Sequence, residues 1–198
     1  MKICVIGAPS TGKSVFAKSL AAELSRRGHS TELVQEYPSR YLQEVGAPKY
    51  AWEQLAISIG QYEAEQQTTR DHLVTDGAAF ATYIYAQRLI PKRASDTDWP
   101  RYRHLLDVLR QLARHSVSSY DLIFLLTHIF PPQDDGVRAK EHLSRHVCQA
   151  IGRDLEAYLQ TERVEHHRLK ANDTHALEKA LNLIEQRLLI QSPVRAQA

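Results

Sequence analysis

The residues from Gly7 to Ser14 read GAPSTGKS and match the phosphate-binding pattern G-x-x-x-x-G-K-[ST]. In this pattern the glycines let backbone N–H groups curve around phosphate oxygens, and Lys13 brings a positive charge to the outer phosphates. The hydroxyl of Ser14 is a suitable oxygen ligand for Mg²⁺. The pattern therefore predicts an ATP site, with Ser14 also a ligand of Mg²⁺, that is formed by Gly7, Ala8, Pro9, Ser10, Thr11, Gly12, Lys13, Ser14 and Val15.

Two acidic residues, Glu36 and Asp76, follow segments that read as β-strands. Ligands of open α/β sheets bind beyond the carboxyl ends of the strands, so both carboxylates are expected near the phosphates. We expect Asp76 to bind Mg²⁺ together with Ser14, and Glu36 to accept the proton of an attacking hydroxyl group. The opposite assignment also agrees with the sequence, and so does a structural role in which each acid begins a turn or caps a helix.

A third charged cluster, PPQDDGVRAKEHLSR, occupies residues 131–145 and follows another apolar segment. This position is typical of a lid over the ATP phosphates, and we expect the lid to span about residues 131–161. Within it, Arg138 is expected to contact ATP and to stabilise charge on the transferring phosphoryl group. The alternative is an ordinary loop followed by a solvated helix.

The segment ANDT at residues 171–174 stands where a GTPase would carry the base-reading motif N-K-x-D, which it does not match. We therefore expect Asn172 to lie beside the adenine of ATP. Capping of the last helix by this segment is the alternative interpretation.

These residues require a scaffold in which strands and helices alternate along the chain. The hydrophobic pattern predicts five strands, at residues 1–7, 30–36, 72–77, 121–127 and 164–171. It predicts helices at residues 13–28, 50–70, 78–90, 103–115, 138–161 and 174–190. Such alternation favours a parallel sheet covered on both faces, an α/β three-layer sandwich of the P-loop NTPase and nucleoside-kinase type. We expect one domain over residues 1–190 and a frayed tail at 191–198.

The composition is that of an ordinary globular protein, with 198 residues of which 43% are hydrophobic and 24% charged. The net charge of +2 is too small to indicate a nucleic-acid partner by itself. Cys4 and Cys148 lie far apart and suggest no disulfide framework. Because the sequence contains no membrane-length apolar run and no signal-peptide layout, we expect a cytoplasmic protein with no membrane partner, or one of the host cytoplasm if it is phage-encoded.

Four segments, QEYPSRYL, ISIGQYEAEQ, LVTDGAAFATYIYAQ and PPQDDGVR, resemble in order and spacing the nicotinamide riboside kinase domain of a bacterial bifunctional NAD-salvage protein. Small relatives of that domain are labelled AAA-type ATPases, and the similarity covers nearly the whole chain. The resemblance implies a nucleoside-kinase-like fold, ATP, Mg²⁺ and phosphorylation of a hydroxyl group on a small nucleoside-type acceptor. It also implies roles for Glu36, Tyr37 and Gln61 on the acceptor side and for Asp76 and Arg138 near the phosphates.

The chain departs from that family at two places on the acceptor side. The third strand of the family usually ends in Asp-Thr-Asp, whereas here it ends in Asp76-Gly77-Ala78, so that one carboxylate is missing. The stretch after the next helix is replaced by residues 88–103, which combine five cations with Trp99 and Tyr102.

Basic and aromatic side chains together suit phosphate contact and base stacking, and we expect Arg93 and Trp99 to contact the substrate. This segment leaves open a second function, a bacteriophage-type kinase that phosphorylates 5-hydroxymethyluracil in DNA. A solvated loop is the structural alternative. A third function is an ATPase switch module, but a lid arginine supplied by the same chain favours a kinase. The main prediction is therefore a P-loop kinase with a free nucleoside-type acceptor.

Overall fold

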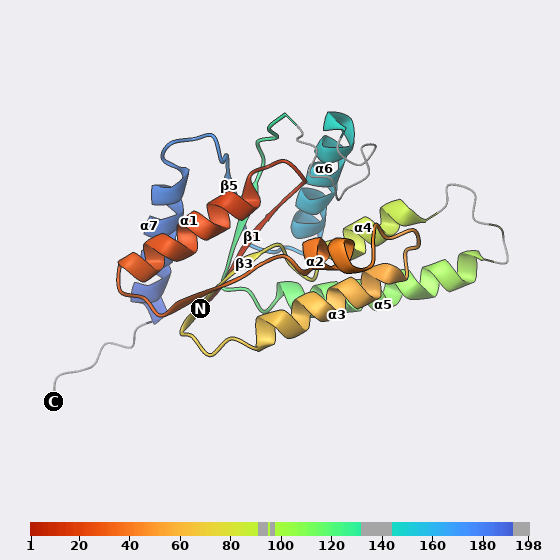
Figure 1. The fold of residues 1–198 in the computed structure, drawn as a ribbon, viewed down its shortest axis with the longest axis horizontal. Coiled ribbons are helices and arrows are strands. Elements are labelled where there is room, and N and C mark those ends of the chain that lie inside the picture. Colours follow the sequence, from red (N-terminus) through yellow and green to blue (C-terminus); the bar gives the residue numbers. More distant parts are fainter. Residues whose placement is uncertain (91–94, 96–97, 132–143, 192–198) are drawn as a thin grey trace.

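A five-stranded parallel sheet lies at the centre of the fold, with the strand order β2-β3-β1-β4-β5 (Figure 1). The computed structural model describes residues 1–90, 95, 98–131 and 144–191. The strands are β1 (Lys2–Gly7), β2 (Thr31–Val34), β3 (His72–Asp76), β4 (Leu122–Leu126) and β5 (His167–Leu169). The helices are α1 (Lys13–Arg26), α2 (Tyr37–Glu44), α3 (Glu53–Gln66), α4 (Ala81–Leu89), α5 (Trp99–Val117), α6 (Arg145–Thr161) and α7 (Ala176–Gln191).

Helices cover both faces of this sheet and form the outer layers. Along β1, alternate side chains point to opposite faces. Ile3 and Val5 pack with α1 and α7 in one core, while Cys4 and Ile6 pack with α4, α5 and α6 in the other. Figure 1 shows α1 and α7 together on one side of the molecule. The predicted α/β three-layer fold of the P-loop NTPase type is confirmed.

The register of the strands brings the predicted site residues to one edge of the sheet. Val5 of β1 pairs with Asp76 of β3, and Gly7 pairs with Leu126 of β4. Since all strands are parallel, the phosphate loop after β1 and the acids after β2 and β3 lie at the same, carboxyl edge.

Two helices differ from the sequence-based expectation at their first turn, and each carries a proline there. Pro38 lies in the first turn of α2, a helix that was not predicted. Similarly, the predicted loop after residue 90 ends at Trp99, where α5 begins with a proline in its first turn. Proline is well tolerated there, because the first N–H groups of a helix have no intrahelical partner.

The predicted helix over residues 138–161 is wrong in its starting point. Ser144 has an extended backbone (φ −62°, ψ 140°), and its side chain accepts a hydrogen bond from Val147 N at 3.3 Å. Ser144 is therefore the N-cap of α6, which begins at Arg145, and residues 138–143 of the predicted helix lie outside the described residues.

The predicted lid over residues 131–161 is described at residue 131 and from residue 144 onward. Most of this part is a core helix, because Cys148, Ile151, Leu155 and Leu159 of α6 are buried against the sheet. At the C-terminal end, α7 includes the first residue of the predicted tail, and residues 192–198 lie outside the described residues. Among the described helices, none is long and apolar enough to cross a membrane.

Candidate functional site

The phosphate loop between β1 and α1 is shaped by its own side chains and by two neighbouring loops. Ser10 and Gly12 have positive φ values of 62° and 78°, which is unusual for a serine. The Thr11 hydroxyl donates to Ala8 O at 2.8 Å, and Phe130 N, from the loop after β4, donates to Ser10 O at 2.8 Å. These two hydrogen bonds hold the curved backbone that the sequence pattern predicts.

Gly12 is the point at which three loops meet. A Cβ atom at this position would lie 3.1 Å from the ring of Phe130 and 3.3 Å from Cβ of Ala171. Together with its positive φ, this crowding accounts for glycine at the position. It also shows that the loop before α7, which carries Asn172, lies beside the phosphate loop.

The first turn of α1 is open to an anion. Gly12 is its N-cap and provides no side-chain hydrogen bond, and the first turn contains no acidic residue. The N–H groups of this turn and the positive end of the helix dipole are therefore available for phosphate oxygens.

A compact ion pair stands at the mouth of this loop. Nζ of Lys13 lies 2.9 Å from Oε2 of Glu36, and the two side chains are only 11% and 12% exposed. The other carboxylate oxygen of Glu36 accepts a hydrogen bond from the hydroxyl of Ser39, in the first turn of α2. The structure thus brings two of the predicted catalytic residues into contact and holds the carboxylate from two sides.

Asp76 ends β3 beside this pair and is 4% exposed. Burial raises the pKa of its carboxyl above the ordinary value, while the charge of Lys13 and a hydrogen bond from Ser14 act in the opposite direction. Its Oδ1 atom is buried and has no hydrogen-bond partner among the described residues. A buried, unsatisfied carboxylate oxygen beside a loop hydroxyl fits an oxygen-binding cation such as Mg²⁺. Asp76 and Ser14 are the residues that would hold it.

A pocket of about 330 Å³ extends from the Lys13–Glu36 pair. Its walls are mostly apolar and come from α2, α4 and α6, with Leu42, Ala81 and Ile151 as examples. Arg88 also lines it and forms an ion pair of 2.5 Å with Asp154, which ties α4 to α6. Pockets of this kind, with apolar walls and a few polar groups, are typical of small-molecule sites.

Gln54 is the most deeply placed amide in the lining of this pocket. It comes from α3, is 5% exposed, and lines the pocket together with Ile57 of the same helix. Since buried amide groups are almost always hydrogen-bonded, Gln54 is suited to pair with a polar group of a ligand.

The structure does not bring every predicted substrate residue to this pocket. Gln61 is 1% exposed within α3, where it accepts a hydrogen bond from Tyr37 N at 2.8 Å. Trp99 lies at the exposed start of α5, with the guanidinium of Arg103 5.9 Å from its ring centre. Gln61, Tyr37 and Trp99 are not among the residues that line the pocket. Arg93 and Arg138 lie outside the described residues.

Asn172 occupies a turn before α7, and its neighbour Asp173 stabilises that turn. Oδ1 of Asp173 accepts a hydrogen bond from His175 N at 2.9 Å, and Oδ2 accepts one from Lys179 Nζ at 2.7 Å. The capping interpretation of this segment is therefore supported for Asp173, while Asn172 remains the candidate neighbour of the adenine.

Sequence reasoning missed Ser39 and Gln54. Ser39 lies on α2, which was not predicted because Pro38 stands in its first turn. Gln54 carries a signal that was available: it shares the buried face of α3 with Ile57, Ser58 and Gln61. A polar residue on the buried face of a helix indicates either a hydrogen-bond network or a ligand contact.

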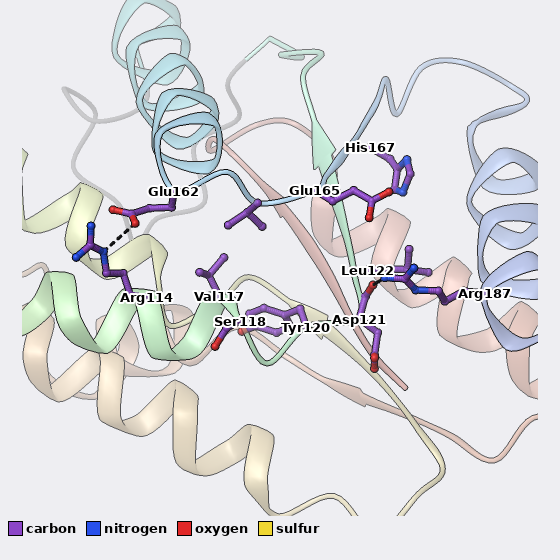
Figure 2. A pocket seen from close by; sticks show the side chains of 11 residues that line it. Arg114, Val117, Ser118, Tyr120, Asp121, Leu122, Glu162, Glu165, His167 and Arg187 are labelled. Carbon is purple, nitrogen blue, oxygen red and sulfur yellow. Dashed lines mark hydrogen bonds and ion pairs between the residues drawn. The ribbon is translucent and has the colours of Figure 1, made fainter. Parts of the chain in front are cut away.

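A second pocket, of about 450 Å³, lies at the opposite edge of the sheet, where β4 begins (Figure 2). Its lining mixes cations and acids, and Glu162 is bound there to Arg114 at 2.8 Å. Within the part of the chain that the structure describes, no group of three or more His, Cys, Asp or Glu residues could hold a metal ion. The phosphate loop is at the other edge, so this pocket is not part of the same site.

Solved structures with a similar fold include two of the NadR protein. The structure in complex with NR is 18% identical, with a TM-score of 0.72 over 99% of this chain and 54% of that chain. The structure in complex with NAD and AMP-PNP is 17% identical, with a TM-score of 0.69 over 99% of this chain and 51% of that chain. The chain therefore spans about half the length of the NadR chains it matches.

Deoxyadenosine kinase from M. mycoides with bound dATP has the same fold. It is 15% identical, with a TM-score of 0.61 over 93% of this chain and 100% of that chain. No curated protein matches the chain. The family model described as an AAA domain matches residues 2–176, and the chain therefore belongs to this AAA domain family.

Proposed function

We propose that this protein is a kinase that transfers the γ-phosphoryl group of ATP to a hydroxyl group of a small nucleoside-type acceptor. The observation that carries the proposal is the position of the apolar pocket, which opens directly onto the Lys13–Glu36 pair at the phosphate loop. An acceptor in that pocket would meet a carboxylate and the outer phosphate of ATP at the same place.

In this reaction a bond forms between the acceptor oxygen and the γ-phosphorus, and the bond from that phosphorus to the leaving oxygen of ADP breaks. Glu36 accepts the proton of the acceptor hydroxyl. Lys13 balances the negative charge on the transferring group. A magnesium ion, when bound by Ser14 and Asp76, would neutralise further charge on the phosphates.

The walls of the pocket support a flat, largely apolar ring with a polar edge. Most of the lining is apolar, and the amide of Gln54 is available to pair with such an edge. The neighbouring folds include a protein in complex with NR and a deoxyadenosine kinase with bound dATP, which agrees with an acceptor of the nucleoside class.

Replacing Gln54 with Leu is expected to raise the KM for the acceptor by about tenfold, because the polar edge of the ring would lose its partner. The turnover number at saturating acceptor and the KM for ATP should change little. Gln66→Leu, at an exposed position of the same helix, is the matched control. Equal acceptor KM values for Gln54→Leu and the parent would show that Gln54 does not contact the acceptor.

Replacing Glu36 with Gln is expected to lower kcat by about 10²-fold, since the amide cannot take up the proton. The shape of the side chain and its bond to Ser39 can be retained, so the KM for ATP should stay close to that of the parent. Steady-state kinetics with ATP and acceptor varied independently measure both quantities. A rise in the KM for ATP with unchanged kcat would contradict a role as proton acceptor.

The decisive experiment is an acceptor screen in which ATP consumption and product mass are measured together. Free nucleosides, nicotinamide riboside and hydroxymethylated DNA serve as acceptors. A phosphorylated small molecule is the expected product. Phosphorylated DNA alone would support the DNA kinase alternative, and ATP hydrolysis without a phosphorylated product would support the ATPase switch.

A further inference from the structure

A chain of buried and partly buried hydrogen bonds runs through α3 and ends beside Glu36. Gln61 uses both ends of its amide: Oε1 accepts from Tyr37 N at 2.8 Å, and Nε2 donates to Oε1 of Glu65 at 2.8 Å. Tyr37 directly follows Glu36 in the sequence. The backbone of the Glu36–Tyr37 pair is thereby attached to the interior of the protein.

Glu65 is the anchor of this chain. Its side chain has no exposed surface and lies 2.7 Å from Nζ of Lys2, at the start of β1. Both of its carboxylate oxygens accept from the hydroxyl of Tyr120, each at 2.9 Å. Lys2 also lies over the Tyr120 ring, 4.7 Å from its centre. The carboxylate is therefore held by Lys2 in β1, by Tyr120 just before β4 and by Gln61 on α3.

The charge of Glu65 determines which way the Gln61 amide points. A carboxylate only accepts hydrogen bonds, so it must face the NH₂ end of the Gln61 side chain. The carbonyl end is then left for Tyr37 N, which only donates. An apolar residue at position 65 would no longer fix the orientation of the Gln61 amide.

The ring of Tyr37 is held by the same helix. A Cβ atom at position 60 would overlap this ring where it stands, and glycine lets the ring lie against the helix. Glycine inside a helix costs about 1 kcal/mol relative to alanine. In α3 this cost arises at Gly60, where the ring of Tyr37 lies against the helix. Tyr37 is thus held both by its backbone and by its side chain.

We propose that Gln61, oriented by Glu65, is a positioning residue that holds Glu36 in place for proton transfer. This inference rests on the proposed function, in which the carboxylate of Glu36 must lie between Lys13 and the acceptor hydroxyl. Gln61 itself does not line the pocket and touches neither substrate. Stability alone does not account for the network, because a buried ion pair is often no more stabilising than apolar residues of similar volume.

The first test is Gln61→Met, which keeps the volume of the side chain and removes both hydrogen bonds. We expect kcat to fall by at least about tenfold, since small misplacements of reacting groups have large effects on rate. The KM for ATP should stay within about twofold, because the phosphate loop is untouched. Hydrogen exchange at the Tyr37 amide should become faster. Parental kcat in Gln61→Met would overturn the proposal, whatever the exchange rate at Tyr37.

The second test exchanges the two residues and separates positioning from simple loss of stability. In Gln61→Glu alone, two carboxylates face each other, and kcat should fall. In the double variant Gln61→Glu with Glu65→Gln, the acceptor at position 61 again faces Tyr37 N, and the amide at position 65 donates to it. We expect the double variant to recover most of kcat. Failure of a folded double variant to exceed Gln61→Glu alone would contradict the proposal.

Glu162→Gln is the matched control, because it weakens a pair of ion bridges between α5 and α6 at the far edge of the sheet. It should change the melting temperature without changing kcat. Failure of the positioning role can be distinguished from failure of the proposed function. If the parent phosphorylates no acceptor, the proposed function fails, whereas an active parent with an equally active Gln61→Met refutes the positioning role.

Discussion

Lys13→Ala is expected to lower the rate of phosphoryl transfer by about 10³-fold. The side chain of Lys13 is only 11% exposed, so its charge acts where water screens it weakly. The same change removes the ion pair that Lys13 forms with Glu36. Single-turnover transfer from labelled ATP, with excess enzyme, measures the chemical step directly.

The control for this prediction is Lys18→Ala, at an exposed position on the same helix. It should retain the parental rate, and circular dichroism should show that both variants are folded. Transfer by Lys13→Ala at close to the parental rate would exclude the phosphate loop as the site of the reaction.

Asp76→Asn is expected to lose Mg²⁺-dependent turnover by a similar factor of about 10³. The amide keeps the shape of the side chain but loses the negative charge that a cation requires. The loss should be larger for turnover than for binding of ATP in the absence of Mg²⁺. Titration of activity with Mg²⁺ checks the prediction, and coincident titration curves for variant and parent would refute it.

The same variant should be more stable than the parent at neutral pH without metal. The pKa of Asp76 is raised in the folded state, so the ionised carboxylate destabilises the fold at pH values above that raised pKa. The difference should shrink as the pH falls and vanish below about 4, the ordinary pKa of aspartate, where both states are protonated. Melting temperatures between pH 3 and 8 measure this effect. A variant less stable than the parent at pH 7 would contradict a destabilising effect of the buried Asp76 carboxylate.

Local sequence signals were sufficient for the sheet and for the position of the phosphate loop within it. The phosphate loop is a contiguous motif, and β4 is a run of five buried apolar residues, as expected for a strand covered on both faces. Glu36 and Asp76 were predictable because the carboxyl ends of parallel strands meet at one edge. In each case the deciding information lies within a few neighbouring residues.

The acceptor half was not predictable in the same way, because it depends on contacts between distant segments. Gln61 matches the pattern of an acceptor contact, but its amide is used up by Tyr37 and Glu65, which no local pattern indicates. Trp99 was interpreted as part of a loop, whereas a proline in the first turn places it on α5. The pocket itself is built from α2, α3, α4 and α6. Of these helices, α2 was not predicted, because Pro38 stands in its first turn.

The crowding at Gly12 has a consequence for the thermodynamics of nucleotide binding. Phe130 and Ala171 lie close to Gly12, and Ser10 accepts a hydrogen bond from the loop after β4, so the phosphate loop is in contact with two other loops. We therefore expect its backbone entropy to be lost when the chain folds, before a phosphate ligand binds. Binding to such a preorganised cradle carries little ordering penalty, and each hydrogen bond to a phosphate contributes more fully to affinity.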